Sequence, residues 1–400
     1  MSTQSAPRIR FTQTAPQQSF RLLELPPELA EVLSAKDAPT LYLKSSSSTG
    51  PNAVDKDNYV NLCTLTKTYR VRQVQSSNSI HLLAPSPAER VRLLSGKISS
   101  DVNGLDGVDT ISAIAKCSST LELQSLSETE EVDIARRLLE DKLRVYDRLS
   151  VDAVGEDTVM RDEGEDLEEG HGVSSGSGPQ RESEGVIRNR ILNEVPMCAT
   201  RCRAVWRELC GFVATDLRTG TGLVAYRPSA RVRLDVWKRI QEGSVLEGID
   251  LGKLFLVNDL WKAVLTEDGE EPFPRELFNA VVRRVAEPTG SNDDDAELRW
   301  VNLDMAIVVR FVGETYLEAT APTERSLIGR TEFLAAWKDL LPEGWRDQVS
   351  LDKIQGSYNL PDPISIYYHR QSEVTKAASS SGATVKNARN WHERFKAQRK

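Results

Sequence analysis

The chain has 400 residues, and 39% of them are hydrophobic. This length exceeds one compact domain and allows two or three small cores. No run of about 18 apolar residues exists and the N-terminal stretch lacks an apolar segment, which argues against a membrane span and a secretory signal. The five cysteines are odd in number and too sparse for a disulfide framework, so they indicate reduced thiols of a cytosolic or nuclear protein.

The formal net charge of −8 comes from one segment. Residues 152–169 hold nine acids and one base, so this segment alone carries −8, whereas residues 370–400 hold eight bases and two acids and carry +6. We interpret the first as part of a disordered acidic linker over 150–185 and the second as a basic tail suited to an anionic partner. Solubility alone is the alternative explanation for both.

The first third of the chain predicts a small β structure. Residues 1–18 are polar and rich in Pro and Gln, which is typical of disorder. Five short β-type segments follow, at 40–44, 59–63, 67–74, 79–84 and 119–123. A few short strands leave unpaired edges, which favours pairing with another chain. We therefore expect a partial β-barrel over 19–125, completed by partner chains.

A helix is predicted next, within 126–149. Apolar residues repeat every three or four positions there, and Ser127 with Glu130 has the spacing of a capping box. We expect this helix to span 128–147.

The second half repeats a pattern of helices closed by a short β ribbon. Such a pattern is typical of a winged helix. We therefore predict three winged-helix-like domains in series, at 186–228, 229–303 and 304–369, and an α+β class for the whole chain. One irregular helical domain is the alternative.

Patterns of catalysis or metal binding are absent from the sequence. Cys198, Cys202 and Cys210 lack a fourth ligand at zinc spacing, and the Gly-rich residues 219–222 precede a ribbon rather than a helix, so they do not form a phosphate loop. We expect a non-enzyme without cofactor or metal. A hydrolase with an unfamiliar site is the alternative, and it would need a deep pocket with shifted carboxylates.

Three strings of residues resemble a known family. They are Phe-Arg-Leu-Leu-Glu-Leu-Pro-Pro-Glu-Leu at 20–29, Lys-Thr-Tyr-Arg-Val-Arg-Gln-Val-Gln-Ser-Ser-Asn-Ser at 67–79, and Leu-Pro-Glu-Gly-Trp at 341–345 followed by Leu-Asp-Lys-Ile-Gln-Gly at 351–356. They closely resemble the sister chromatid cohesion protein Dcc-one family, over most of 20–369 apart from the linker.

The resemblance implies a non-catalytic, nuclear subunit of the alternative clamp loader built on the Ctf-eighteen ATPase subunit. In that family the N-terminal strands assemble with Ctf-eight and the C-terminal segment of Ctf-eighteen. The assembly contacts the catalytic subunit of DNA polymerase epsilon, and the winged helices bind single- and double-stranded DNA without sequence preference.

Carried onto this sequence, the resemblance implies a partner interface at Leu22, Leu25, Tyr69, Arg70, Arg72, Gln73, Val74, Asn78 and Ser79. The alternative makes Tyr69 a local core residue and Asn78 a turn former.

Two groups of basic residues are candidates for DNA binding. Arg201, Arg203 and Arg207 lie on the second helix of the first winged unit, where recognition helices carry phosphate contacts. The tail offers bases with an aromatic ring between them, at Lys386, Arg389, Trp391, Arg394, Lys396 and Arg399. A solvated helix face is the alternative for the first group, and a nuclear localisation signal or an unbound tail for the second.

A stand-alone winged-helix transcription or chromatin factor is the rival function. It should fold through residue 130 without partners and bind DNA selectively.

Overall fold

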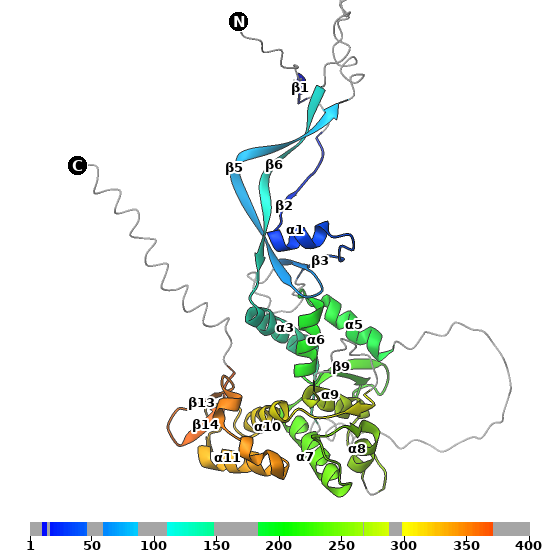
Figure 1. Ribbon diagram of the computed structural model, residues 1–400, viewed down its shortest axis with the longest axis vertical. Helices are drawn as coiled ribbons and strands as arrows, with labels where there is room; N and C mark the ends of the chain where they lie inside the picture. The colour runs from blue at the N-terminus through cyan, green and yellow to red at the C-terminus, as the bar shows by residue number, and fades with distance from the viewer. Residues whose placement is uncertain are drawn as a thin grey trace, which may run out of the picture. The chain divides into compact units, whose positions relative to one another are not determined.

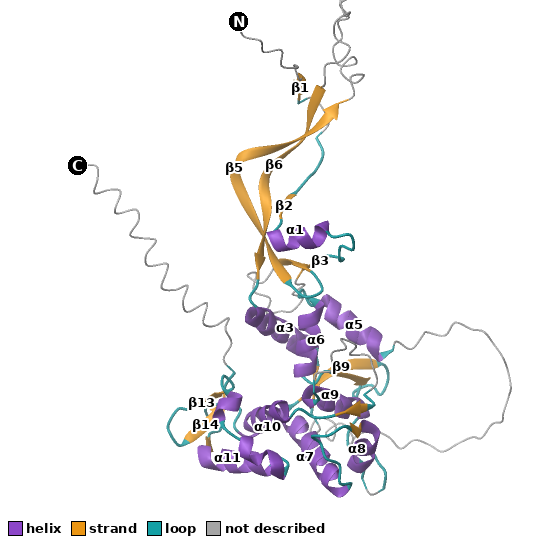
Figure 2. Ribbon diagram, in the orientation of Figure 1, coloured by secondary structure: helices purple, strands orange, loops and turns teal. Residues whose placement is uncertain are grey.

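The structure, a computed structural model, describes residues 10–13, 17–45, 59–86, 110–147, 183–266, 268–287 and 298–370 (Figure 1). They form two compact units that divide between Leu126 and Ser127. The first unit is mostly strand and the second mostly helix (Figure 2), which confirms the α+β class. The boundary precedes the predicted acidic linker 150–185 in the sequence.

The first unit is built on one sheet. Its strands follow the order β1–β6–β5–β4–β3, and β2 also pairs with β6. β1 and β2 run parallel to β6, and the other pairs are antiparallel. The described strands do not close into a barrel. The elements are β1 (Arg10–Thr12), β2 (Leu22–Glu24), α1 (Pro27–Ser34), β3 (Tyr42–Ser45), β4 (Val60–Cys63), β5 (Thr68–Ser86) and β6 (Thr110–Ser125).

Strands β5 and β6 form a long two-stranded ribbon (Figure 1). Separate strands at 67–74 and 79–84 were predicted, but both belong to β5. The register shifts between Gln75 and Ile80, because the polar run 76–79 is accommodated as a bulge rather than a turn. A bulge leaves extra residues of one strand unpaired while the ladder continues on either side. Likewise, β6 extends well beyond the predicted 119–123.

A small core lies where α1 covers the sheet. The helix begins at Pro27, which occupies a first-turn position that needs no backbone donor. The buried residues of this core are Leu29 of α1, Leu62 of β4 and Tyr69 of β5. Residues 1–18 were predicted to be disordered. Within them, Arg10–Thr12 form strand β1, which pairs with β6.

The second unit opens with α3 (Glu128–Lys142) and β7 (Arg144–Tyr146). The predicted capping box is confirmed, since the side chains of Ser127 and Glu130 each accept a hydrogen bond from the other's backbone N–H. The predicted helix over 128–147 was too long. The chain is extended from Leu143 onward, and Tyr146 packs edge-on against Phe212 and Tyr226 instead of continuing the helix.

The second unit contains three repeats with a similar order of elements: a helix, a short strand, two or three helical segments and one or two closing strands. In the first repeat α3 and β7 are followed by α5 (Glu184–Glu194), α6 (Ala199–Glu208), β8 (Phe212–Thr215) and β9 (Leu223–Pro228). The second contains α7 (Ala230–Leu246), β10 (Phe255–Leu256), α8 (Val257–Val264), α9 (Arg275–Val285) and β11 (Trp300–Val301). The third contains α10 (Met305–Thr320), β12 (Ile328–Gly329), α11 (Arg330–Asp339), the 3-10 helices η3 (Glu343–Gln348) and η4 (Leu351–Ile354), β13 (Tyr358–Asn359) and β14 (Ser365–Tyr368).

In the first and third repeats the early strand pairs with the last one. The orders are β7–β9–β8 and β12–β14–β13, and β10 pairs with β11 in the second repeat. β7 runs parallel to β9, whereas β10 and β12 run antiparallel to their partners. Because α3 and β7 belong with α5 to β9, the predicted linker lies inside the first repeat. Its residues 150–182 are outside the described part of the chain.

One hydrophobic core runs through all three repeats. It extends from Tyr146 through Trp237 and Phe278 to Trp337 and Ile366. Polar contacts also cross between repeats, since the Trp237 indole N–H donates to the Leu340 carbonyl at 2.8 Å. The repeats are therefore parts of one packed body.

An ion network joins three segments of this body. The Glu208 carboxylate lies 2.6 Å from Arg136 of α3 and 3.7 Å from Arg370, which follows β14. Burial by itself raises the pKa of Glu208, but the charge and hydrogen bond of Arg136, with the charges of Arg370 and Arg284, outweigh burial and lower the pKa. Glu208 is therefore held as a carboxylate that ties α3, α6 and the end of the third repeat together.

Candidate partner-binding and nucleic-acid-binding surfaces

The outer edge of β3 is a candidate interaction surface of the first unit. Its inner edge pairs with β4, with Leu43 opposite Leu62. No described strand lies along its outer edge. Tyr42 and Leu43 are 55% and 72% exposed. An unpaired strand edge flanked by apolar side chains is a template for another chain.

The first unit also exposes more large apolar side chains than it buries. Among its described residues, seven hydrophobic residues are buried: Leu29, Leu62, Cys63, Tyr69, Ala113, Ala115 and Cys117. Eleven large hydrophobic residues are exposed: Phe11, Phe20, Leu23, Leu25, Val32, Tyr42, Leu43, Val60, Leu65, Ile80 and Leu83. Scattered exposed apolar residues are ordinary, but an excess of this kind makes the first unit a candidate for binding other chains.

The predicted interface residues on β5 divide between the two faces of the sheet. Tyr69 is 3% exposed and packs with Leu29 and Leu62. It therefore serves the local core, which was the alternative reading of this residue.

The polar neighbours of Tyr69 on β5 are more accessible. The Arg70 guanidinium lies over the Tyr59 ring, 4.7 Å from its centroid. Arg72 lies 3.8 Å from Glu122 of β6 and is 68% exposed. The Gln73 side chain donates to the Ser119 hydroxyl at 3.3 Å, and Val74 is half-buried.

Asn78 and Ser79 lie in the bulge of β5, and both are exposed. Leu22 lies on β2, opposite Thr120 of β6, and is half-buried. Leu25 follows β2 and is 37% exposed. Of these residues, Leu25, Asn78 and Ser79 remain accessible to a partner, whereas Leu22 contributes mainly to the join between β2 and β6.

The three candidate arginines of α6 have different environments. Arg201 forms ion pairs with Glu128 and Glu131 of α3, the second at 3.1 Å. Burial by itself lowers the pKa of Arg201, but the two hydrogen-bonded carboxylates outweigh it and raise the pKa. Arg203 is half-buried and Arg207 is exposed. Arg201 is thus committed to joining α6 with α3, since Glu131 is 4% exposed and needs a cation.

The candidate tail residues, Lys386, Arg389, Trp391, Arg394, Lys396 and Arg399, lie outside the described residues.

The sequence did not predict two sets of candidate binding residues. Tyr42 and Leu43 were recognised only as part of a strand, because one strand does not show which of its edges is left unpaired. Arg188 of α5 and Arg283 of α9 line a pocket together with Arg207. Nearly a hundred positions separate the first and last of these arginines, so no local pattern could bring them together.

The described residues contain no group of three or more His, Cys, Asp or Glu side chains that could hold a metal ion. Cys198, Cys202 and Cys210 are fully buried, and burial raises the pKa of the Cys210 thiol to about 11. Within the same residues, each helix is too short or too polar to cross a membrane.

One comparison with known proteins agrees with the resemblance found in the sequence. A search of curated proteins finds no match. A family model described as sister chromatid cohesion protein Dcc1 matches residues 20–379, which is nearly the whole chain and includes both units. This match gives the chain a role in sister chromatid cohesion. The chain belongs to the Dcc1 family of sister chromatid cohesion proteins.

Proposed function

We propose that the chain is a non-catalytic nuclear subunit of the alternative clamp loader built on the Ctf-eighteen ATPase subunit. It would scaffold Ctf-eight and the C-terminal segment of Ctf-eighteen, and link the loader to the catalytic subunit of DNA polymerase epsilon and to DNA. The open sheet of the first unit is the observation that carries this proposal, because it leaves an edge and an apolar surface for other chains to cover.

The energetics favour completion by added strands. Burying a large apolar side chain contributes about 1.5–3 kcal/mol, and the exposed set includes Tyr42 and Leu43 on the open edge itself. A strand added beside β3 would satisfy the backbone groups of that edge and cover part of this surface at once. Ctf-eight and the Ctf-eighteen segment are the proposed sources of these strands.

The repeats of the second unit support the proposal of three winged helices. Each has a helix, a strand and then two or three helical segments. The first and third repeats close with two strands that form a three-stranded sheet with the early strand, and the second closes with one strand, β11, paired with β10. We propose that the first winged helix starts at α3 instead of residue 186, because β7 pairs with β9. We propose that these units, with Arg203, Arg207 and the basic tail, bind single- and double-stranded DNA through phosphates, without sequence preference.

Co-expression with Ctf-eight and the Ctf-eighteen segment tests the scaffold. We expect the three chains to elute together in gel filtration, and Leu43→Glu to abolish co-elution because a charge on the open edge opposes strand addition. Leu246→Glu is the matched control, because Leu246 is 81% exposed on the second unit and should tolerate the charge. Co-elution that survives Leu43→Glu would contradict an interface at β3.

The same experiment separates the rival function. A stand-alone transcription or chromatin factor would be a soluble monomer without the added chains and would bind one DNA sequence over others.

DNA binding is tested on the assembled complex. Reversing the charges of the tail bases should weaken DNA binding at moderate salt, because each phosphate contact contributes to affinity by releasing counterions. The loss of these contacts should also reduce the salt dependence of binding. The complex should stay intact, because the tail is far in sequence from the first unit. Unchanged DNA binding would remove the tail from the proposal. The reversed residues are Lys386, Arg389, Arg394, Lys396 and Arg399.

A further inference from the structure

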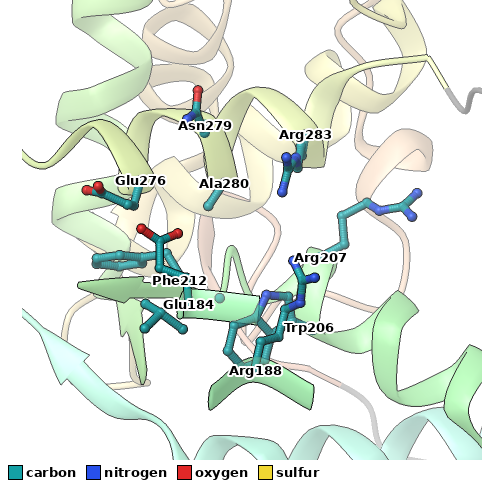
Figure 3. Close-up of a pocket in the computed structure, with 11 residues that line it drawn as sticks. Glu184, Arg188, Trp206, Arg207, Phe212, Glu276, Asn279, Ala280 and Arg283 are labelled. Atoms are coloured by element: carbon teal, nitrogen blue, oxygen red, sulfur yellow. The ribbon is translucent and has the colours of Figure 1, made fainter. Parts of the chain in front are cut away.

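A pocket of about 120 Å³ lies between the first and second repeats (Figure 3). Helices α5 and α6 and strand β8 supply one side of its lining, and α9 supplies the other. A single water molecule needs only about 10–15 Å³ of such space, so the pocket has room for a small polyatomic group. α6 and α9 occupy the same position in their repeats, immediately before the closing strands.

Five charged side chains line this pocket. Three are arginines, one each from α5, α6 and α9: Arg188, Arg207 and Arg283. Two are carboxylates, Glu184 and Glu276. Figure 3 shows the two carboxylates near each other on one side, and the guanidinium groups of Arg207 and Arg283 on the other. The lining therefore carries an excess of one positive charge, and its cations are concentrated on one side.

The wall between these groups is tightly packed. The indole of Trp206 lies so close to Gly211 that a β-carbon at Gly211 would be 2.7 Å from the ring. The preceding Cys210 has a φ of 51°, a left-handed conformation that few residues other than glycine adopt. This turn leads the chain from α6 directly into β8. It fixes Trp206 and Phe212 in the lining, so the pocket is formed before any ligand enters.

We propose that this pocket binds a phosphate-sized anion, either free or as the terminal phosphate of a small molecule. Guanidinium groups bind phosphate through paired, charge-assisted hydrogen bonds. Three arginines from three separate helices line this space, which is of suitable size. An anion in this space would bridge α6 of the first repeat and α9 of the second, and so would strengthen the join between the two repeats.

The carboxylate side makes binding dependent on pH. Burial and, next, the charge of Glu276 raise the pKa of Glu184, although the charges of Arg188 and Arg283 oppose this. Protonation of Glu184 removes a negative charge from the pocket lining, and the positive charge of Arg207 in the same lining remains. Anion affinity should therefore increase as the pH falls through the pKa of Glu184, and bound anion should raise that pKa further.

Calorimetric titration of the full chain with inorganic phosphate and pyrophosphate at low ionic strength tests the proposal. We expect saturable binding that Arg207→Gln and Arg283→Gln each weaken by roughly 10-fold to 100-fold, the effect of losing a charge-assisted hydrogen bond. Arg231→Gln is the matched control, because Arg231 is exposed at the start of α7 and lies outside the pocket.

Glu276→Gln gives a change in the opposite direction. It removes a negative charge from the lining and should tighten binding, which a merely misfolded variant would not do. A further titration with ATP identifies the source of the anion: tighter binding than pyrophosphate indicates a nucleotide, and equal binding indicates an inorganic anion. Absence of saturable phosphate binding, or binding that both arginine variants leave unchanged, would overturn the proposal.

Discussion

Replacing Gly313 by alanine should destabilise the second unit. Gly313 lies in the buried middle of α10, and a β-carbon there would come within 3.0 Å of three ring atoms of Trp337. Real β-carbons essentially never approach a neighbour so closely. Trp337 is fully buried on α11, and its indole N–H donates to the Val309 carbonyl at 2.9 Å. The added methyl group must therefore displace the ring and strain this hydrogen bond.

The magnitude follows from three effects. Overpacking of a core by one methyl group costs about 1–3 kcal/mol. The weakened indole hydrogen bond costs about 1 kcal/mol more. Alanine recovers about 0.5–1 kcal/mol, because glycine is the poorer helix residue. We therefore expect Gly313→Ala to lower the free energy of unfolding by about 2 kcal/mol.

Urea unfolding of the full chain, followed by tryptophan fluorescence, measures this change. Gly344→Ala is the matched control, because a β-carbon at Gly344 would meet no atom within 4 Å. This control should change the free energy of unfolding by less than about 0.5 kcal/mol. If Gly313→Ala proves as stable as the unmodified chain, the close packing of α10 on α11 is refuted.

Three further predictions concern ion pairs and a helix cap. Arg201→Ala should lower the free energy of unfolding by about 3 kcal/mol, because it leaves a buried carboxylate of α3 without its cation, whereas Arg203→Ala should change it little; urea unfolding compares the two. Acidification should destabilise the chain as the pH falls through the lowered pKa of Glu208, since a carboxylate paired with Arg136 stabilises the fold only above that pKa. Glu208→Gln should therefore reduce the acid sensitivity of the melting temperature. Ser127→Ala should cost about 1 kcal/mol through loss of the cap, and an unchanged melting temperature would contradict the capping box.

A local pattern predicted where the first helix of the second unit begins. Helix α3 begins at the capping box of Ser127, because this signal acts within one turn of chain. The predicted recurrence of helices followed by short strands is also present in the second unit.

Non-local pairing explains what the sequence did not predict. The polar run 76–79 has the composition of a turn, yet β5 continues through it because β6 provides a partner on both sides of the bulge. Tyr146 continued the helical spacing of α3, but it forms an aromatic cluster with Phe212 and Tyr226. Similarly, the spacing of Arg201, Arg203 and Arg207 could not reveal that only Arg201 meets the carboxylates of α3.

The shared core of the three repeats has a consequence for how the second unit meets a long ligand. Because one hydrophobic core extends through all three repeats, packing fixes the distances between the repeats. If one repeat contacts a polymer such as the proposed DNA ligand, the other two repeats are already positioned, so their contacts cost little additional ordering entropy. A polymer with the wrong spacing or curvature, by contrast, cannot be accommodated by rearranging the repeats.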